Sequence, residues 1–243
     1  MTPIASIIIP TYNRIDLLTQ RSLKSALAQN FKDYEVIVVD DYSTDKTEEV
    51  VKRWMKRYEN LRYYKMSRNM GLSAVRNRGF AWAKGRYVVC LDDDNELLPD
   101  FLKITTANLE LYEGDMVLAV SVGKIIKYVK KNFEDYAPPP QPKKIVSMDW
   151  GWLFKKEIFE GMNPLQYDEE LRANDDTDFG IRFFKNYTCI GINKPLGIAF
   201  DSENEKDSLS FPSEREIQGM RLFMAKNEKE YDEPNEKRYL YRL

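Results

Sequence analysis

The chain has 243 residues, 43% of them apolar, which is enough for the large core of a single folded unit. Its 37 Lys and Arg residues balance 39 Asp and Glu residues, and the net charge of -2 excludes a general attraction to nucleic acid or to an anionic membrane, so a polyanion must be bound locally. The absence of histidine excludes a Ser-His-Asp triad and imidazole metal ligands, which leaves acid and base chemistry to carboxylates, Lys, Tyr or Cys.

The first third of the chain alternates short β-branched runs with longer amphipathic stretches. Its periodicity predicts strands at residues 5–9, 35–39, 62–65 and 86–91, and helices at residues 16–29, 45–57 and 72–84. The runs IIIP, VIVVD and VVCLD are apolar on both faces, which is typical of buried parallel strands. We therefore predict an α/β fold: a Rossmann-like, mostly parallel central sheet flanked by helices, in a single globular domain.

The remainder of the chain is less regular. We expect a helix at residues 100–112, a strand at 116–122, a charged helix in NDDTDFGIRFF, a strand at 188–192 and a polar C-terminal helix. The proline cluster APPPQPKK, within residues 128–146, excludes regular structure and predicts a surface loop, either over a cleft or without a role. Pro234 breaks the charged stretch 226–243, which we expect to be a solvated helix and tail.

Two cysteines and the lack of long apolar runs bear on location. Cys90 and Cys189 lie in apolar runs, where they are predicted to be core residues, and so few cysteines argue against a secreted disulfide scaffold. No stretch approaches the roughly 18 apolar residues that cross a bilayer, and MTPIASIIIP lacks the features of a signal peptide. We expect a cytoplasmic protein without a transmembrane segment; peripheral attachment to a membrane surface and a homodimer both stay open.

Polar side chains follow four consecutive predicted strands. Ligands of open α/β sheets bind beyond the carboxyl ends of the strands, so these side chains are candidates for one binding site. They are Thr11 to Arg14, Asp40 with Asp41, Arg68 with Asn69, and Asp92 to Asp94.

The sharpest of these clusters is LDDDNELLPD, in which three aspartates end a buried strand. Burying adjacent carboxylates is costly without a cation. In an extended chain alternate residues point the same way, so Asp92 and Asp94 can share a face while Asp93 points elsewhere. Oxygen ligands without His or Cys suit Mg²⁺ or Mn²⁺. The alternative is a solvated acidic turn that serves the dipole of the following helix.

A second acidic pair, Asp40 and Asp41, follows VIVV. A carboxylate there can accept the imide N–H of uracil or a ribose hydroxyl. The later residues Thr44 and Asp45 are better candidates for a helix cap. We therefore predict a direct nucleotide contact for Asp40.

The segment SRNMGLSAVRNRG would supply positive charge to a diphosphate. Arg68 and Arg76 carry the charge, Asn69 adds an amide, and Gly71 allows a tight turn before the helix. Neither GxGxxG nor a P-loop occurs in the chain, which weakens the dinucleotide-binding and NTPase alternatives.

The segment NDDTDFGIR places Asp175, Asp176 and Asp178 at the start of a helix, where the macrodipole favours acids whatever their function. A transferase that activates an acceptor hydroxyl needs a base, and this cluster is the best candidate outside the metal motif. Trp150 and Trp152 flank Gly151 and would offer a flat face to an acceptor sugar; core packing is the equal alternative for each.

In their joint order, PTYNR, VVDDYSTD, RNMGLSAVRNRG, LDDDNELLPD and NDDTDFGIR resemble the family-2 inverting glycosyltransferases of the GT-A fold, over residues 4–185. The resemblance implies one domain at residues 1–225, with a nucleotide-sugar-binding half at 1–95 and an acceptor-binding half at 96–225, followed by the tail at 226–243. It also implies transfer from a nucleotide-diphosphate sugar, with UDP-sugars the commonest donors, to a glycan, lipid-linked or protein acceptor.

The resemblance further implies roles for matching residues. The nucleotide-sugar-binding positions are Thr11, Tyr12, Arg14, Asp40, Arg68, Asn69, Arg76, Asp92 and Asp93. Asp92 and Asp94 match the DxD motif, with Asp94 as the direct ligand of Mn²⁺ or Mg²⁺. Asp176 matches the catalytic base, and Asp175 lies beside it on the acceptor side.

Three departures from the family pattern are visible. Asn95 replaces a frequent Asp, Asp175 replaces the Glu of the catalytic pair, and the QxxRW signature of processive synthases is missing, so we expect one sugar to be added per encounter. Two other functions stay open. A nucleotidyltransferase would need a glycine-rich, lysine-bearing loop after the first strand, which PTYNR does not supply. A non-catalytic sugar- or nucleotide-binding module would bind without turnover.

Overall fold

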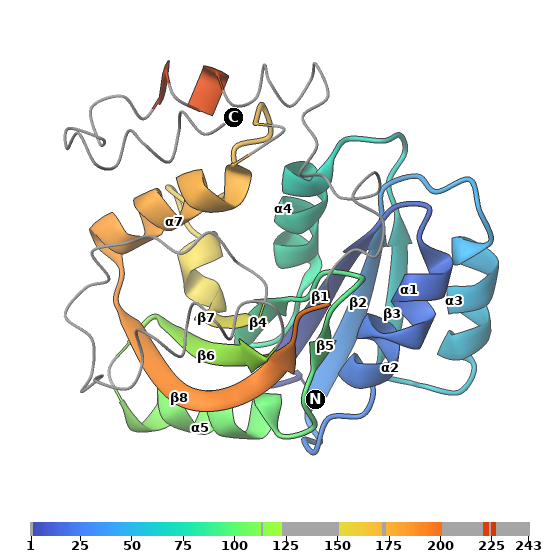
Figure 1. Ribbon diagram of the computed structural model, residues 1–243, viewed down its shortest axis with the longest axis horizontal. Helices are drawn as coiled ribbons and strands as arrows, with labels where there is room; N and C mark the ends of the chain where they lie inside the picture. Colours follow the sequence, from blue (N-terminus) through green and yellow to red (C-terminus); the bar gives the residue numbers. More distant parts are fainter. Residues whose placement is uncertain are drawn as a thin grey trace.

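A computed structural model describes residues 2–112, 114–122, 151–171, 174–200, 221–223 and 225–226 (Figure 1). Its strands are β1 (Ala5–Thr11), β2 (Tyr34–Asp40), β3 (Leu61–Lys65), β4 (Tyr87–Cys90), β5 (Glu96–Leu97), β6 (Met116–Val122), β7 (Trp152–Lys155) and β8 (Cys189–Ile198). Its helices are α1 (Ile15–Gln20), α2 (Ser22–Ala26), α3 (Thr47–Met55), α4 (Leu72–Trp82), α5 (Phe101–Leu111) and α7 (Asp175–Asn186), with the 3-10 helix η1 (Lys156–Phe159). The proline cluster, Trp150 and residues 227–243 lie outside the described residues.

The described strands form one sheet in the order β3-β2-β1-β4-β7-β6-β8-β5. β1 pairs in parallel with β2 and β4, β2 with β3, and β6 with β8. β7 runs antiparallel to β4 and β6, and β5 runs antiparallel to β8. The predicted α/β fold, a mostly parallel sheet with flanking helices, is confirmed. The antiparallel strands β5 and β7 were not predicted, because runs of two and four residues are too short to show a period.

Alternate residues of the central strands build two separate cores. Ile7 and Ile9 belong to the core on the side of α1, α2, α3 and α5. Ile8 belongs to the core on the opposite side, with α4, η1 and α7. In Figure 1, α4 and α7 lie on one side of the sheet and α5 lies on the other. Both faces of these strands are therefore buried, which explains why their sequences are unbroken apolar runs.

The helix expected at residues 16–29 is divided into α1 and α2, so the expectation of one continuous helix was wrong. Arg21 leaves the helical conformation, with φ -117° and ψ -87°. Its Nη1 donates to the backbone carbonyl of Asp94 at 3.2 Å, and its guanidinium lies 4.1 Å from the centroid of the Phe200 ring. Hydrophobic periodicity did not predict this one-residue break, because the break depends on contacts with residues that are distant in the sequence.

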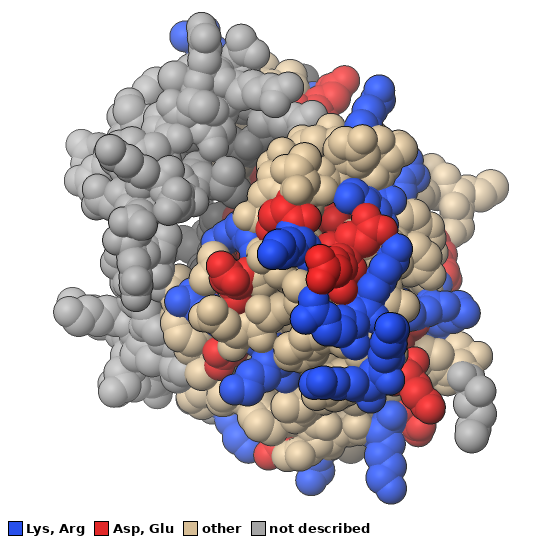
Figure 2. All heavy atoms as spheres, turned by 90° about the vertical axis from the view of Figure 1, so that its right-hand side faces the viewer, with Lys and Arg blue, Asp and Glu red and all other residues tan. Residues whose placement is uncertain are grey.

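The surface carries both signs of charge. On the face shown in Figure 2, Lys and Arg side chains lie among Asp and Glu side chains. On α3, Lys52 pairs with Glu48 at 2.6 Å and Arg53 pairs with Glu49 at 2.7 Å, each across one helical turn. No helix in the described ranges combines the length and the apolar character needed to span a bilayer.

Candidate active site

The carboxyl ends of the first four strands meet at one rim. The backbone N–H of Asp41 donates to the carbonyl of Thr11 at 2.9 Å, and that of Met66 donates to the carbonyl of Asp40 at 2.8 Å. The turn after β4 is bound to the end of β1 by a side chain: Thr11 Oγ1 donates to Asp93 Oδ2 at 2.8 Å. The expected meeting of these strand ends is confirmed.

Two loops at this rim are fastened to each other by Asn13, whose backbone is left-handed with φ 53°. Its Oδ1 accepts the backbone N–H groups of Thr44 at 2.7 Å and Asp45 at 3.3 Å. Its own N–H donates to Ser43 Oγ at 2.8 Å. Asp45 Oδ1 in turn accepts the N–H of Thr47, the first residue of α3, at 3.0 Å, but the N-cap of α3 is Lys46, so the prediction of Thr44 or Asp45 as the cap residue was wrong by one or two positions.

Asp40 is enclosed by the protein and has no exposed surface. Its Oδ1 accepts the N–H of Ser43 at 2.7 Å, and its Oδ2 accepts the hydroxyl of Tyr63. The exposed side chains of this rim include Tyr12 and Tyr42. Asp40 therefore stabilises the loop between β2 and α3 from the protein interior. Its direct contact with a nucleotide base stays a prediction.

Asp41 holds the loop between β3 and α4. Its carboxylate oxygens accept the N–H groups of Met70 at 2.7 Å and Gly71 at 2.8 Å, and Asn69 Nδ2 donates to its backbone carbonyl at 3.3 Å. Gly71 has φ 88°, which confirms the expected tight turn. Arg68 is exposed on the same loop. Sequence reasoning missed the role of Asp41, because two adjacent acids at a strand end look equivalent.

Asp92, Asp93 and Asp94 follow β4 in a turn rather than in an extended chain. The N–H of Asn95 closes this turn on the carbonyl of Asp92 at 3.2 Å. Arg14 contacts Asp93 Oδ1 through Nη1 and Asp94 Oδ2 through Nη2, both at 2.7 Å. Asp93 is 5% exposed whereas Asp94 and Asp92 are 28% and 29% exposed, so the expected contrast between Asp93 and the other two is present, although a turn and not the alternation of an extended chain produces it.

The acids of this turn are electrostatically crowded. Burial raises the pKa of Asp93 to about 7, although Arg14 and the hydroxyl of Thr11 favour its charged form. Burial also raises the pKa of Asp92, against the opposing charge of Arg76. Neighbouring carboxylates add to both shifts. A bound cation would relieve this repulsion.

Arg76 connects the aspartate turn to α7. It lies on α4 and is only 3% exposed. Its Nη2 contacts Asp92 Oδ1 at 3.0 Å, and its Nη1 contacts Asp175 Oδ2 at 3.1 Å. Ser73 Oγ, also on α4, donates to the same Asp175 oxygen at 3.2 Å. The two acidic clusters therefore meet at Asp92 and Asp175, whereas contact of Arg76 with a diphosphate stays a prediction.

Asp176 lies next to Asp175 in the first turn of α7. The preceding Asn174 is left-handed, with φ 57°. Asp176 Oδ1 accepts the N–H of Thr177 at 2.7 Å, and the side chain is partly exposed. Both uses of an acid at this position, stabilising the helix start and facing a substrate, are compatible with this geometry.

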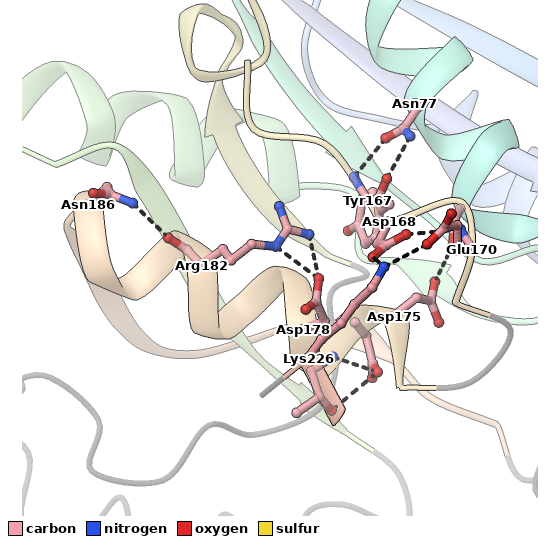
Figure 3. Close-up of polar contacts among 12 residues, drawn as sticks. Asn77, Tyr167, Asp168, Glu170, Asp175, Asp178, Arg182, Asn186 and Lys226 are labelled. Atoms are coloured by element: carbon pink, nitrogen blue, oxygen red, sulfur yellow. Dashed lines mark hydrogen bonds and ion pairs between the residues drawn. The ribbon is translucent and has the colours of Figure 1, made fainter. Parts of the chain in front are cut away.

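Helix α4 also holds the segment that precedes α7 (Figure 3). Asn77 Nδ2 donates to the carbonyl of Tyr167 at 2.9 Å, and Asn77 Oδ1 accepts the N–H of the same residue at 2.8 Å. Within α7, Asp178 is buried and accepts Nε and Nη2 of Arg182 at 2.9 and 2.6 Å. Asp178 therefore forms an ion pair with Arg182 across one turn of α7 and is not available as a base.

A short piece of the C-terminal region packs on this part of the molecule. Lys226 forms ion pairs with Asp168 and with Glu170, the latter at 2.9 Å (Figure 3). Phe223 is buried against Leu171 and Ile181. Sequence patterns gave no indication of these contacts, because they join residues that are far apart in the chain.

The two tryptophans proposed for the acceptor have different outcomes. Trp152 lies in β7 and is 4% exposed. Its ring packs against Phe154 and Phe184, with centroid distances of 6.2 and 6.3 Å. The acceptor-binding role of Trp152 was therefore wrong, because the pairing of β7 with β4 and β6 carries it into the core. Trp150 lies outside the described residues.

The residues at the rim fit a divalent cation that is shared with a phosphate. The described residues contain no group of three or more acidic or cysteine side chains that could hold a metal alone. Mg²⁺ and Mn²⁺ in nucleotide sites usually use one or two carboxylates together with phosphates and water. Asp94 and Asp92, whose side chains are 28% and 29% exposed, have the right chemistry and are accessible.

Comparison with known proteins now identifies the family. Residues 6–182 match the family model described as Glycosyl transferase family 2. The chain belongs to glycosyl transferase family 2. It is 27% identical over 204 residues to the uncharacterized glycosyltransferase EpsJ of Bacillus subtilis, which covers 76% of this chain and 57% of EpsJ. The chain spans little more than half the length of that relative.

Solved structures of glycosyltransferases share this fold. The structure of Staphylococcus aureus TarS 1-349 in complex with UDP-GlcNAc has a TM-score of 0.70 and 24% identity, covering 91% of this chain and 65% of TarS 1-349. The mannosyltransferase PcManGT of Pyrobaculum calidifontis, in complex with GDP-Man and Mn²⁺, has a TM-score of 0.73 and 21% identity. The match covers 97% of this chain and 67% of PcManGT. At this identity the likeness concerns the fold, which is the GT-A fold.

Proposed function

We propose that this family 2 glycosyltransferase moves a single sugar from a nucleoside-diphosphate sugar to an acceptor hydroxyl, with inversion. Asp176 accepts the proton of the hydroxyl. The oxygen bonds to the anomeric carbon from one face, while the bond from that carbon to the diphosphate oxygen breaks on the opposite face. The products are the glycosylated acceptor and the nucleoside diphosphate, and the proton leaves Asp176 to water.

The bridge made by Arg76 carries this proposal. It brings the start of α7 and the turn after β4 to the two nitrogens of one guanidinium. Asp176 follows Asp175 directly, and Asp94 comes two residues after Asp92. A direct displacement needs a base and a leaving-group site at close range, and this arrangement supports both.

A divalent cation is part of the proposal. Asp94, with Asp92, would hold Mn²⁺ or Mg²⁺ beside the donor diphosphate. Such an ion, when bound, offsets the charge that develops on the leaving diphosphate. TarS in complex with UDP-GlcNAc and PcManGT with GDP-Man and Mn²⁺ support a nucleotide-sugar donor, for which we propose a UDP-sugar. The proposed pocket for its nucleotide is the rim of Thr11, Tyr12 and Arg14.

The test compares the wild-type chain with Asp176→Asn and Asp94→Asn, using release of UDP from UDP-sugars in Mn²⁺ and calorimetry with UDP and Mn²⁺. Asp176→Asn should lower turnover by about 10²- to 10⁴-fold, because it removes general-base catalysis. Its affinity for UDP should change by less than about three-fold, because the nucleotide does not meet the base. Asp94→Asn should lower both quantities. Glu49→Gln, at an exposed position of α3, is the matched control and should change neither.

Three outcomes would contradict parts of the proposal. Normal turnover by Asp176→Asn would exclude its role as the base. Turnover that is unaffected by chelators would exclude the cation. UDP binding by the wild-type chain without turnover of any donor, across a set of glycan and lipid-linked acceptors, would favour a non-catalytic binding module.

A further inference from the structure

We propose that Arg76 is a positioning residue that sets the spacing between Asp92 on the donor side and Asp175 on the acceptor side, and that it does not bind the donor diphosphate. This inference rests on the proposed function, which assigns the neighbourhood of Asp92 to the donor and that of Asp175 to the acceptor. It separates Arg76 from the exposed Arg68, for which contact with a diphosphate stays open.

The burial of Arg76 is the first support. A guanidinium that is 3% exposed is tolerated only when it is paired and hydrogen-bonded. Its two terminal nitrogens contact Asp92 and Asp175 at 3.0 and 3.1 Å. Its terminal nitrogens are directed at carboxylates of two different elements, and the side chain has almost no surface through which a diphosphate could reach it. Its charge is therefore committed to protein groups.

Other side chains of α4 point to the same task. Ser73 Oγ donates to Asp175 Oδ2 at 3.2 Å. Asn77 holds both backbone groups of Tyr167, and the guanidinium of Arg76 lies 5.2 Å from the centroid of the Tyr167 ring. Helix α4 thus fixes the start of α7 and the segment before it, relative to the sheet.

The shape of the guanidinium explains why an arginine is needed. Its donors form a rigid planar fork, so two carboxylates bound to its two arms are held at a fixed separation. A lysine preserves the charge but is a single point charge on a flexible stem. A reactant that is misplaced by about 1 Å can react about 10²-fold more slowly. If spacing is the function, Arg76→Lys should be impaired in turnover although it retains the charge.

The experiment measures kcat, donor KM, UDP affinity with Mn²⁺ by calorimetry, and melting temperature. For Arg76→Lys we expect kcat to fall by about 30- to 100-fold, with UDP affinity within about three-fold of wild type. Ser73→Ala should shift kcat in the same direction, by about three- to ten-fold, because it removes one of the donors to Asp175. Arg78→Lys, on the same helix but exposed, is the matched control and should match wild type.

A double-mutant cycle tests whether Arg76 acts through Asp175. In the Asp175→Ala background, Arg76→Lys should lower kcat by less than about three-fold, because the spacing is already lost. Independent, multiplicative effects of the two changes would overturn the inference. A parallel loss of kcat and UDP affinity in Arg76→Lys would also overturn it, since that result indicates a direct diphosphate contact, and so would unchanged kcat.

Two further results are distinguishable from these. If Arg76→Lys does not fold, Ser73→Ala still tests the spacing of Asp175, because it removes only a hydroxyl, and an unchanged kcat would then count against the inference. Absence of transfer by the wild-type chain would contradict the proposed function, and calorimetry on the variants would still decide whether Arg76 binds the diphosphate.

Discussion

The two halves of the molecule hold their acidic side chains in different ways. In the N-terminal half, residues 1–95, the acids at the strand ends are held by neighbours from the same half: Asp93 by Thr11 and Arg14, and Asp41 by the loop before α4. In the C-terminal half, Asp175 is held by α4, which belongs to the other half. The acids of the N-terminal half are thus held locally, whereas Asp175 of α7 is positioned from outside its own half.

This difference indicates where a change will be felt. The N-terminal half contributes the parallel strands β3, β2, β1 and β4, whose faces are both covered, so a defect there should weaken the whole fold. The C-terminal part near α7 depends on contacts that reach across to α4 and Lys226, so a defect there should act locally. Three substitutions and one matched control, in decreasing order of expected effect, test this comparison.

The largest effect is expected for Glu35→Ala in the N-terminal half. Glu35 is buried; its Oε1 accepts the hydroxyl of Ser6 at 2.8 Å and the N–H of Lys84 at 2.7 Å, and its Oε2 pairs with Arg62 at 2.7 Å. Removing it leaves these donors without their acceptor and should lower the free energy of unfolding by about 3 kcal/mol. Chemical denaturation measures the loss, and a value below about 1 kcal/mol would contradict a framework role.

A smaller loss is expected for Gly85→Ala. A Cβ at this position would lie 2.5 Å from the backbone carbon of Ala5 and 2.6 Å from the nitrogen of Ser6, on the central strand β1. A backbone cannot move aside as a side chain can, so we expect a loss of about 1–3 kcal/mol in the free energy of unfolding.

Its matched control is Gly161→Ala in the C-terminal half. Nothing lies within 4 Å of a Cβ there, and only the φ of 89° opposes the change. We expect a loss of about 1 kcal/mol at most. Hydrogen exchange should show faster exchange throughout the central strands for the Gly85 variant and only near residue 161 for the control. The same pattern in both variants would break the comparison between the halves.

The N-terminal half was also the more predictable from sequence. Its strands repeat a local signal, an apolar run followed by an amphipathic helix, and that signal specifies a parallel sheet. The C-terminal half inserts β7 between β4 and β6, and four residues carry too little periodicity to reveal this. The choice between acceptor binding and core packing for Trp152 stayed open for that reason, since its burial depends on strands distant in sequence.

The candidate site was predictable in its residue types but not in its contacts. The position of Asp92 after a predicted strand was enough to place it at the carboxyl edge of the sheet, whereas the place of Asp175 in the same site came from the family resemblance. The contacts of the three aspartates were not predictable, because they depend on the point at which β4 gives way to a turn. The burial of Arg76 and the break at Arg21 were also hidden, since each is caused by partners far along the chain.

The smallest effect is expected for Lys226→Met, which removes the ion pairs with Asp168 and Glu170. Burial alone would raise the pKa of Asp168, but Lys226 outweighs it and leaves that pKa below its usual value. The two acids raise the pKa of Lys226. The contribution to stability is therefore present between about pH 4 and pH 10; it fades as pH falls through the lowered pKa of Asp168 or rises through the raised pKa of Lys226.

At pH 7 the difference between wild type and Lys226→Met should be below about 1 kcal/mol, because these side chains are partly exposed and water and salt screen the pairs. It should shrink as pH falls through the lowered pKa of Asp168, and faster hydrogen exchange should be confined to α7 and the segment before it. A difference that persists unchanged at low pH would mean that Lys226 stabilises through its aliphatic stem rather than its charge. In that case the C-terminal residues would hold α7 by packing, as Phe223 does, and the local character of this region would have an apolar cause.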